Sequence, residues 1–250
     1  MRFIARLDVK NGQLIKTINL EGLRQLGNCK EYALSYYENN IDELFLSDPV
    51  ASLYGRDPLY SLLDEITDDI FIPITISGGI KTIKDIRKLL LIGADKVAIN
   101  TNAILNPEFI NESVSIFGSQ SVAISIQAKF IDNNWYCYTN CGRDNSGKKL
   151  DLWINEIQKR GVGEIILTSA NKEGLNGGLD IKLIDFVKNL IKVPVTISGG
   201  FGKLEHLDEI IKFKDILSGI AIAGSLHYKK FTINQIKNHC KTVGIKTREI

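Results

Sequence analysis

A seven-residue stretch that occurs twice is the strongest constraint on the fold of this chain. Residues 74–80 read ITISGGI and residues 195–201 read VTISGGF, so that the two serines, Ser77 and Ser198, lie 121 positions apart in a chain of 250. In each copy a proline precedes a β-branched run, two glycines follow the serine, and a charged segment with periodic apolar residues comes next. This order is typical of a strand, a tight turn and a helix.

Two adjacent glycines after a strand also suit an anion. They let backbone N–H groups approach a phosphate closely, and the following helix adds the positive end of its dipole. For one copy alone, a plain tight turn between strand and helix would be the better interpretation. Because the pair recurs in register, the sequence favours two phosphate-sized sites, one in each half of the chain.

Strands and helices are predicted to alternate along the whole chain. The expected strands are 3–8, 43–47, 74–77, 96–99, 122–127, 164–168, 195–198 and 219–223, and a segment with helical periodicity follows each. Eight such units predict a (β/α)8 TIM barrel. The repeat extends to residues 42–46 and 163–167 at the same offset. We therefore expect half-barrels of about 1–120 and 121–250 in a single domain, since neither half could close its sheet alone.

Two segments interrupt this alternation. After the first strand we expect a loop through Lys16, Asn19 and Glu21. After the fifth strand the sequence predicts a hairpin over 130–139, and the polar stretch 142–149 that follows is expected to be mobile.

Composition argues against several classes of function. The net charge is +2 and the basic residues are interleaved with acids, so nothing indicates a nucleic-acid partner. No apolar run approaches the roughly 20 residues needed to span a membrane, and we expect a cytoplasmic protein. The four cysteines lack the paired spacing of a zinc site, and none of the three histidines has a plausible catalytic partner. We predict free thiols, no metal and no cofactor.

The chemistry should lie where the strands end, because active sites of such barrels are built at the carboxyl ends of the strands. Two inward carboxylates between two phosphate sites would suit acid/base work on a long bisphosphate. The first strand supplies Asp8, but the matching position of the fifth strand is Gln127. An amide cannot exchange a proton near neutral pH, so Gln127 can only orient a ligand.

Short motifs along the chain together resemble one family. They are residues 7–12 (LDVKNG), Asp48 with 51–52 (AS), 77–80 (SGGI), 93–101 (GADKVAINT), 117–120 (FGSQ) and 163–169 (GEIILTS). In this order, and nearly from end to end, they look like the cyclase (HisF-type) subunit of imidazole glycerol phosphate synthase, which acts in histidine biosynthesis. The resemblance implies an enzyme that takes ammonia from a glutaminase (HisH-type) partner at the bottom of the barrel and adds it to a bisphosphorylated substrate.

The resemblance also implies roles for individual residues. Asp8 matches the catalytic strand-one aspartate, and Gln127 replaces the acid of strand five. The phosphate- and substrate-binding positions would be Lys16, Asp48, Gly79, Asn100, Thr101, Gly174, Gly200, Gly224 and Ser225. The ammonia gate would be a ring of Arg2, Glu43, Lys96 and Glu164. Taken without the resemblance, the same four charges would be an ordinary salt-bridge plug.

Departures from the family pattern point to a divergent paralogue. Besides Gln127, the strand-six loop has Asn171 for an aspartate and the longer Glu173 for another. Arg6 stands where the family usually places a small inward side chain. A buried guanidinium needs a partner, so we expect Arg6 to pair with Asp8 and to make it a weaker base.

Three other functions therefore stay open. A paralogue would aminate or amidinate a nucleotide sugar of surface polysaccharide or flagellin. A non-enzymatic barrel would bind a phosphorylated ligand and activate a glutaminase, although Asp8 and Lys16 argue against it. The sister sugar isomerase of histidine synthesis shares the repeat and both phosphate sites but does not need the charged ring.

Overall fold

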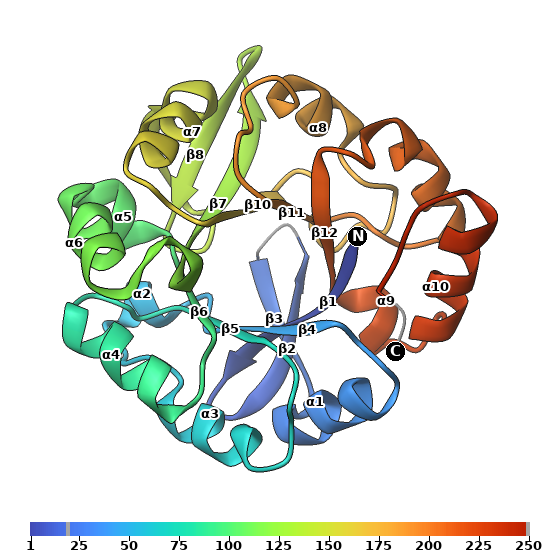
Figure 1. Cartoon of the computed structure of the whole chain (residues 1–250), viewed down its shortest axis with the longest axis horizontal. Coiled ribbons are helices and arrows are strands. Elements are labelled where there is room, and N and C mark those ends of the chain that lie inside the picture. The colour runs from blue at the N-terminus through green and yellow to red at the C-terminus, as the bar shows by residue number, and fades with distance from the viewer. Residues whose placement is uncertain (19–20, 249–250) are drawn as a thin grey trace.

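The computed structural model describes residues 1–18 and 21–248 and shows a closed barrel of eight parallel strands surrounded by helices (Figure 1). The barrel strands are β1 (Arg2–Lys10), β4 (Glu43–Ser47), β5 (Ile74–Ser77), β6 (Lys96–Ile99), β7 (Val122–Ile131), β10 (Glu164–Ser169), β11 (Val195–Ser198) and β12 (Leu217–Ile222). β1 pairs with β12, and β10 pairs with β7, so that the ring of eight barrel strands is closed. The predicted (β/α)8 fold is confirmed. Each half of the chain supplies four strands, which supports our proposal of a single domain.

The outer helices follow the apolar periodicity of the sequence. They are α1 (Cys29–Glu38), α3 (Tyr60–Thr67), α4 (Ile83–Ile92), α6 (Glu108–Phe117), α7 (Leu150–Lys159), α8 (Ile181–Val187), the 3-10 helix η2 (Leu204–Phe213) and α10 (Ile233–Thr242). In α4, for example, Thr82 and Asp85 form a capping box at the start, and Ile86 and Leu89 are buried against the barrel. In the described ranges no helix is both long and apolar enough to cross a membrane.

Four short elements were not predicted. They are α2 (Ala51–Tyr54), α5 (Thr101–Leu105), η1 (Ser119–Ser121) and α9 (Gly224–His227). Each has at most five residues, which is too short for a helical period to show in the sequence. Both α5 and α9 begin where a barrel strand has just ended, at Asn100-Thr101 and at Ala223-Gly224.

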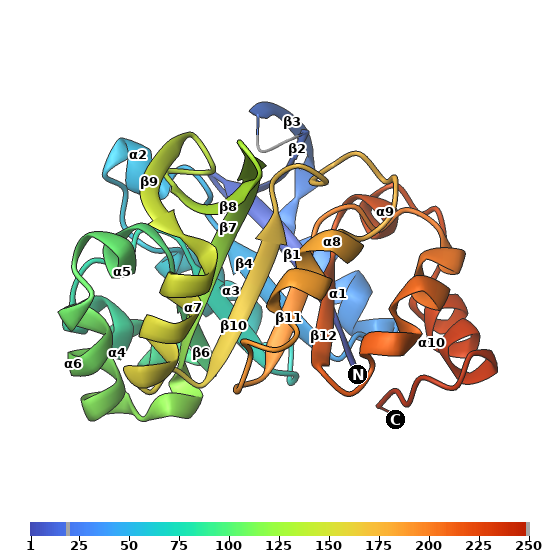
Figure 2. The ribbon, with the colours of Figure 1, turned by 90° about the horizontal axis from the view of Figure 1, so that it is seen from above.

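Each half carries a β-hairpin after its first barrel strand. β1 continues into β2 (Gln13–Ile18) and β3 (Glu21–Asn28), and β7 continues into β8 (Asn134–Thr139) and β9 (Asp144–Lys149). Figure 2 shows both hairpins at one end of the barrel and both chain termini near the other. The hairpin over 130–139 is confirmed, with its first strand continuous with β7.

Two loop predictions were wrong. Lys16 lies within β2 and Glu21 begins β3, while Asn19 lies outside the described residues. Most of the stretch 142–149 is strand β9, which pairs with β8. In β2 the apolar residues Leu14 and Ile15 are adjacent and so break the alternation, and β9 has no apolar side chain. Pairing with a neighbouring strand is what makes both segments extended.

Inward-facing side chains fill the barrel in three layers. The layer nearest the termini consists of charged and hydroxyl groups on Arg2, Glu43, Thr75, Lys96, Glu164 and Thr196. Above it lies an apolar layer of Ile4, Phe45, Ala98, Ala123, Ile166 and Ala221. The third layer, below the hairpins, is polar again and contains Arg6, Thr168 and Ser198. The interior thus changes from charged to apolar to charged along the axis.

Gly163, just before β10, offers a test of how tightly the barrel is packed. A Cβ at Gly163 would lie 2.1 Å from the carbonyl oxygen of Ser119, whereas a Cβ at Gly177 would have no atom within 4 Å. Gly163→Ala should lower the free energy of unfolding by about 1–3 kcal/mol, which corresponds to roughly 2–4 °C in Tm per kcal/mol. Gly177→Ala, the matched control, should leave Tm unchanged or slightly raised. Equal Tm values for the two variants in thermal denaturation would contradict this packing.

Candidate active site at the barrel mouth

The first Gly-Gly turn packs against the neighbouring loop so closely that only glycine fits. Gly78 and Gly79 have φ angles of +96° and +72°, in the left-handed region that side chains rarely adopt. A Cβ at Gly78 would lie 2.3 Å from the carbonyl oxygen of Asp48, and one at Gly79 would lie 2.7 Å from that of Arg56. We call this turn, with Asn100 and Thr101, the first grip.

The second Gly-Gly turn has the same geometry. Gly199 and Gly200 have φ angles of +98° and +93°. A Cβ at Gly200 would lie 2.1 Å from the carbonyl oxygen of Gly178. The sequence repeat is therefore also a repeat of backbone conformation. We call this turn, with Gly174 and Gly224, the second grip.

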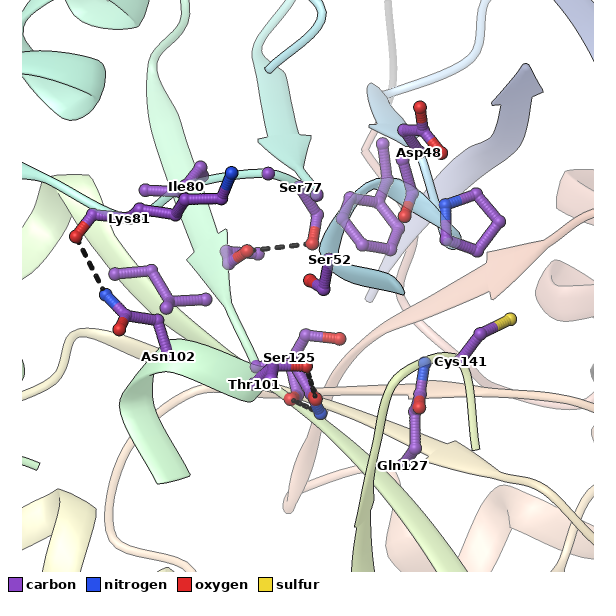
Figure 3. Close-up of a pocket in the computed structure, with 18 of the residues that line it drawn as sticks. Asp48, Ser52, Ser77, Ile80, Lys81, Thr101, Asn102, Ser125, Gln127 and Cys141 are labelled. Atoms are coloured by element: carbon purple, nitrogen blue, oxygen red, sulfur yellow. Dashed lines mark hydrogen bonds between the residues drawn. The ribbon is translucent and has the colours of Figure 1, made fainter. Parts of the chain in front are cut away.

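The first grip opens into a cavity of about 210 Å³, which also reaches Arg6, Gln127 and Cys141. Figure 3 shows Lys81 and Asn102 on one side of this cavity and Gln127 and Cys141 on the other. The side-chain amide of Asn100 donates to the carbonyl oxygen of Ser125 at 2.8 Å and to that of Tyr138 at 3.2 Å. Asn100 is thereby fixed in place beside Thr101.

Lys81 is a cation of the first grip that sequence reasoning missed. Its amine lines the cavity and donates to the carbonyl oxygen of Gly55 at 2.9 Å. The amine forms no salt bridge with a carboxylate of residues 1–18 and 21–248. The sequence contained a signal for this cation, since Lys81 lies two positions after the Gly-Gly pair. A positive charge next to the glycine turn strengthens the case for an anion there.

Asp48 contributes little free charge to this cavity. Its carboxylate pairs with Arg56 at 2.8 Å and accepts from the Val50 N–H at 3.1 Å. Burial raises the pKa of Asp48, and the Arg56 guanidinium opposes that rise. With Asp48 paired to Arg56, Lys81 remains as a cation at this cavity that forms no salt bridge with a described carboxylate.

The second grip is almost closed. Its cavity is only about 20 Å³ and is lined by Lys16, Glu173, Gly174, Gly200 and Gly224. The β2–β3 hairpin lies over it, because a Cβ at Gly174 would be 2.6 Å from the carbonyl oxygen of Thr17. Four predicted residues thus meet here, and Glu173 joins them.

Ser225, another predicted phosphate ligand, follows Gly224 in α9. It is completely buried, and its hydroxyl donates to the carbonyl oxygen of Phe201. In this structure the hydroxyl therefore links α9 to the Gly-Gly turn. Only its backbone remains for a ligand.

Arg6 lies between the two grips and crosses the barrel. From β1 its guanidinium donates to Asp8 at 3.0 Å, to Thr168 of β10 at 3.3 Å and to Ser198 of β11 at 3.2 Å. The predicted pairing of Arg6 with Asp8 is confirmed, and its effect on the basicity of Asp8 stays a prediction. Burial alone would lower the pKa of Arg6, but Asp8 and Glu173 outweigh it and raise that pKa.

Glu173 holds the other side of this cation. One carboxylate oxygen is 3.8 Å from Arg6, and the other accepts from the amine of Lys16 at 2.5 Å. Glu173 is only 3% exposed. Burial favours the neutral acid, yet Arg6 and Lys16 together lower the pKa of Glu173. Charges therefore alternate across the mouth in the order Lys16, Glu173, Arg6, Asp8.

Gln127 lies on β7 at the same mouth, and its side-chain oxygen lacks a hydrogen-bond partner among the described residues. Its Oε1 atom is buried and makes no hydrogen bond to the described residues. Because a buried carbonyl oxygen without a donor is costly, this atom is suited to accept a hydrogen bond from a ligand in the cavity.

The four charges of the bottom layer form a closed ring. Arg2 contacts Glu43 at 2.6 Å and Glu164 at 2.5 Å, and Lys96 contacts the same two carboxylates at 2.8 Å and 2.7 Å. The hydroxyls of Thr75 and Thr196 donate to these carboxylates as well. Every charge is matched by two of opposite sign, so the ring closes the barrel at this end.

The described residues include no cluster of three or more His, Cys, Asp or Glu side chains that could hold a metal. Cys29, Cys137 and Cys240 are free and buried. At the mouth, the alternating row of Lys16, Glu173, Arg6 and Asp8 can bind anions and exchange protons.

Comparison with known proteins places the chain in one group. Residues 2–232 match the model of a family described as histidine biosynthesis protein. A protein of Legionella pneumophila named imidazole glycerol phosphate synthase subunit HisF is 46% identical over 83% of this chain and 99% of its own length. Proteins of the same name from Staphylococcus saprophyticus and a Hydrogenobaculum species are 39% and 40% identical, each over 99% of this chain and 98% of their own.

The charged ring should make the stability of the barrel depend on pH. Burial alone would raise the pKa of Glu164, but Lys96 and Arg2 outweigh it and hold the pKa below its usual 4.5. A carboxylate with a lowered pKa stabilises the folded state above its unfolded pKa, and this contribution is lost as the pH falls toward the folded value. Urea unfolding from pH 7 down to about pH 3 should therefore show a smaller loss of stability in Glu164→Gln than in the unchanged protein. Parallel curves would contradict the assignment.

Proposed function

The chain belongs to the histidine biosynthesis protein family and, within it, to the HisF-type subunits of imidazole glycerol phosphate synthase; from this premise we propose that it is the synthase (cyclase) subunit of a glutamine amidotransferase. It takes ammonia from a glutaminase (HisH-type) partner and adds it to a phosphorylated, sugar-derived substrate. The observation that carries the proposal is the pair of in-register glycine grips on either side of Asp8. We include a cytoplasmic location in this proposal.

The two grips define the kind of substrate. Each offers close backbone approach, and Lys81 and Lys16 add a cation to the first and second grip respectively. A molecule with a phosphate at each end would span the mouth and place its centre over Arg6 and Asp8. Asp8 is then the group positioned to accept or donate a proton at that centre.

The layers of the interior suit the passage of ammonia. The ring of Arg2, Glu43, Lys96 and Glu164 lies at the end away from the hairpins, and the apolar layer that follows contains three alanines. An apolar passage admits neutral ammonia and excludes ammonium, because a charge pays a large desolvation penalty there. The glutaminase partner would dock against the ring.

The paralogue remains a second candidate function, and the row of charges at the mouth favours it. Gln127 supplies no second acid on β7, and Arg6 occupies the centre of the barrel. A substrate other than the histidine intermediate, such as a nucleotide sugar to be aminated or amidinated, would use the same ammonia route and anion grips with a different reacting centre.

Turnover of the histidine-pathway intermediate with ammonium salt separates these candidates. If the chain is a cyclase of the histidine pathway, the purified protein converts this substrate at rates normal for the family. Asp8→Asn should then lower kcat by about 10²–10⁴-fold, since it removes one acid/base group while keeping the shape. Thr232→Ser, at the start of α10, is a control outside the mouth and should leave kcat unchanged.

Three outcomes would reject the cyclase. Absence of turnover, with ammonia-dependent conversion of a nucleotide sugar instead, would establish the paralogue. Binding of phosphorylated ligand that stimulates a glutaminase, without any change in the ligand, would establish the non-enzymatic barrel. Turnover without ammonia would indicate the isomerase.

The charged ring should affect glutamine-dependent turnover more than ammonia-dependent turnover. Lys96→Met removes one cation, leaves Glu43 and Glu164 with a single partner in Arg2, and so disturbs the entrance while the mouth stays intact. Assayed with the glutaminase partner, this variant should lower the ratio of glutamine-dependent to ammonia-dependent kcat several-fold. Lys88→Met, on the outer helix α4, serves as a control for loss of a lysine. An unchanged ratio in Lys96→Met would mean that the ring is a structural plug and not an ammonia gate.

A further inference from the structure

Glu173 is a buried carboxylate at the mouth that has no role in the chemistry proposed above. Gln127 cannot exchange a proton, which leaves Asp8 as the acid/base group of β1. Glu173 follows β10 in the loop of the second grip and is 3% exposed. It lies on the same guanidinium as Asp8, at 3.8 Å and 3.0 Å respectively. Two carboxylates therefore flank Arg6: Asp8 on the first strand, where it was expected, and Glu173 in the loop after β10 instead of a carboxylate on β7.

Glu173 also touches the surface on which an anion would bind. A Cβ at Gly199 would lie 3.4 Å from its Oε2 atom, and the carboxylate lines the second cavity together with Lys16 and Gly200. Its Oε1 atom accepts a hydrogen bond from the amine of Lys16. An anion entering this grip meets Lys16, which lines the cavity, and competes with Glu173 for its amine.

We propose that Glu173 is the second ionisable group of the site: an anion on the second grip takes Lys16 from Glu173, and the released carboxylate exchanges a proton with the substrate held beside Asp8. The identity of the substrate in this inference rests on the proposed function. The exchange of Lys16 between Glu173 and an anion does not depend on the proposed function.

The charges around Glu173 decide its protonation. Burial favours its neutral acid, but Arg6 of β1 and Lys16 of β2 face it and together lower its pKa. His227 of α9 also faces it, and Asp8 lies beyond Arg6 with the same sign of charge as Glu173. Burial lowers the pKa of His227 to about 3, so His227 is neutral near pH 7. Withdrawal of Lys16 leaves Arg6 shared between two carboxylates, and the pKa of Glu173 must rise.

The proton transfer itself is simple. An oxygen of Glu173 forms an O–H bond while an N–H or O–H bond of the substrate breaks, and the bonding electrons stay on the substrate atom. The proton then passes to the leaving group or to water. Asp8, still held by Arg6, lies on the other side of the reacting centre.

A rescue experiment separates this role from a purely structural one. Glu173→Gln keeps the shape of the side chain but cannot exchange a proton, and it should lower kcat by about 10²–10⁴-fold in the ammonia-dependent assay. Gln127→Asp, added to Glu173→Gln, returns a carboxylate to the mouth and should restore kcat at least tenfold. A loss of packing at position 173 would not be repaired by an acid on β7. Full activity of Glu173→Gln, or no gain in the double variant, would overturn the proposal.

A second measurement needs no turnover and therefore stands even if the proposed function fails. Sulfate, which does not titrate in this range, is added at about pH 6, and the infrared spectrum is followed for a protonated carboxyl group. The unchanged protein should gain this band when sulfate is added, and Glu173→Gln should not. The absence of the band in the unchanged protein at saturating sulfate would overturn the exchange of Lys16 between Glu173 and an anion. An inactive protein that still shows the band would reject only the proposed substrate.

Discussion

A permanently charged guanidinium inside the barrel constrains the whole mouth of this protein. Arg6 cannot lose its proton in a protein, so the fold must neutralise it where it lies. Asp8 does so from the same strand, and Glu173 does so from the loop after β10. Glu173 in turn holds Lys16 and with it the β2–β3 hairpin. One buried cation thus links the strand-one aspartate, the strand-six loop and the hairpin that covers the second grip.

The two ends of the barrel solve the same electrostatic problem differently. At the bottom, two cations and two carboxylates form a ring in which each charge has two partners, so nothing remains for a ligand to pair with. At the mouth the charges form an open row that ends in Lys16 on one side and Asp8 on the other. A ring resists change, whereas the ends of a row can exchange partners with a ligand. The open row therefore suits a reacting centre at the mouth.

The sequence predicted the barrel and most of the site because both depend on local, repeated patterns. The Gly-Gly turns at 78–79 and 199–200 need positive φ at the end of a strand, and that need is visible in the residues themselves. The position of Lys16 in a strand was missed, because the apolar residues of β2 do not alternate with polar ones and its extended conformation depends on pairing with β3, where Lys16 faces Arg24. The position of Glu173 against Arg6 joins residues 167 positions apart, and only the closed barrel brings them together.

Charge balance explains why an amide at position 127 belongs with the arginine at position 6. Arg6 and Lys16 carry two positive charges, and Asp8 and Glu173 carry two negative ones. A carboxylate on β7 would add a third negative charge to a buried site with no cation left to pair with it, at a cost that one extra acid/base group would not offset. The neutral Gln127 avoids this cost and still presents an acceptor to the cavity. Gln127 is therefore compatible with Arg6, because Asp8 and Glu173 already balance the two cations of the mouth.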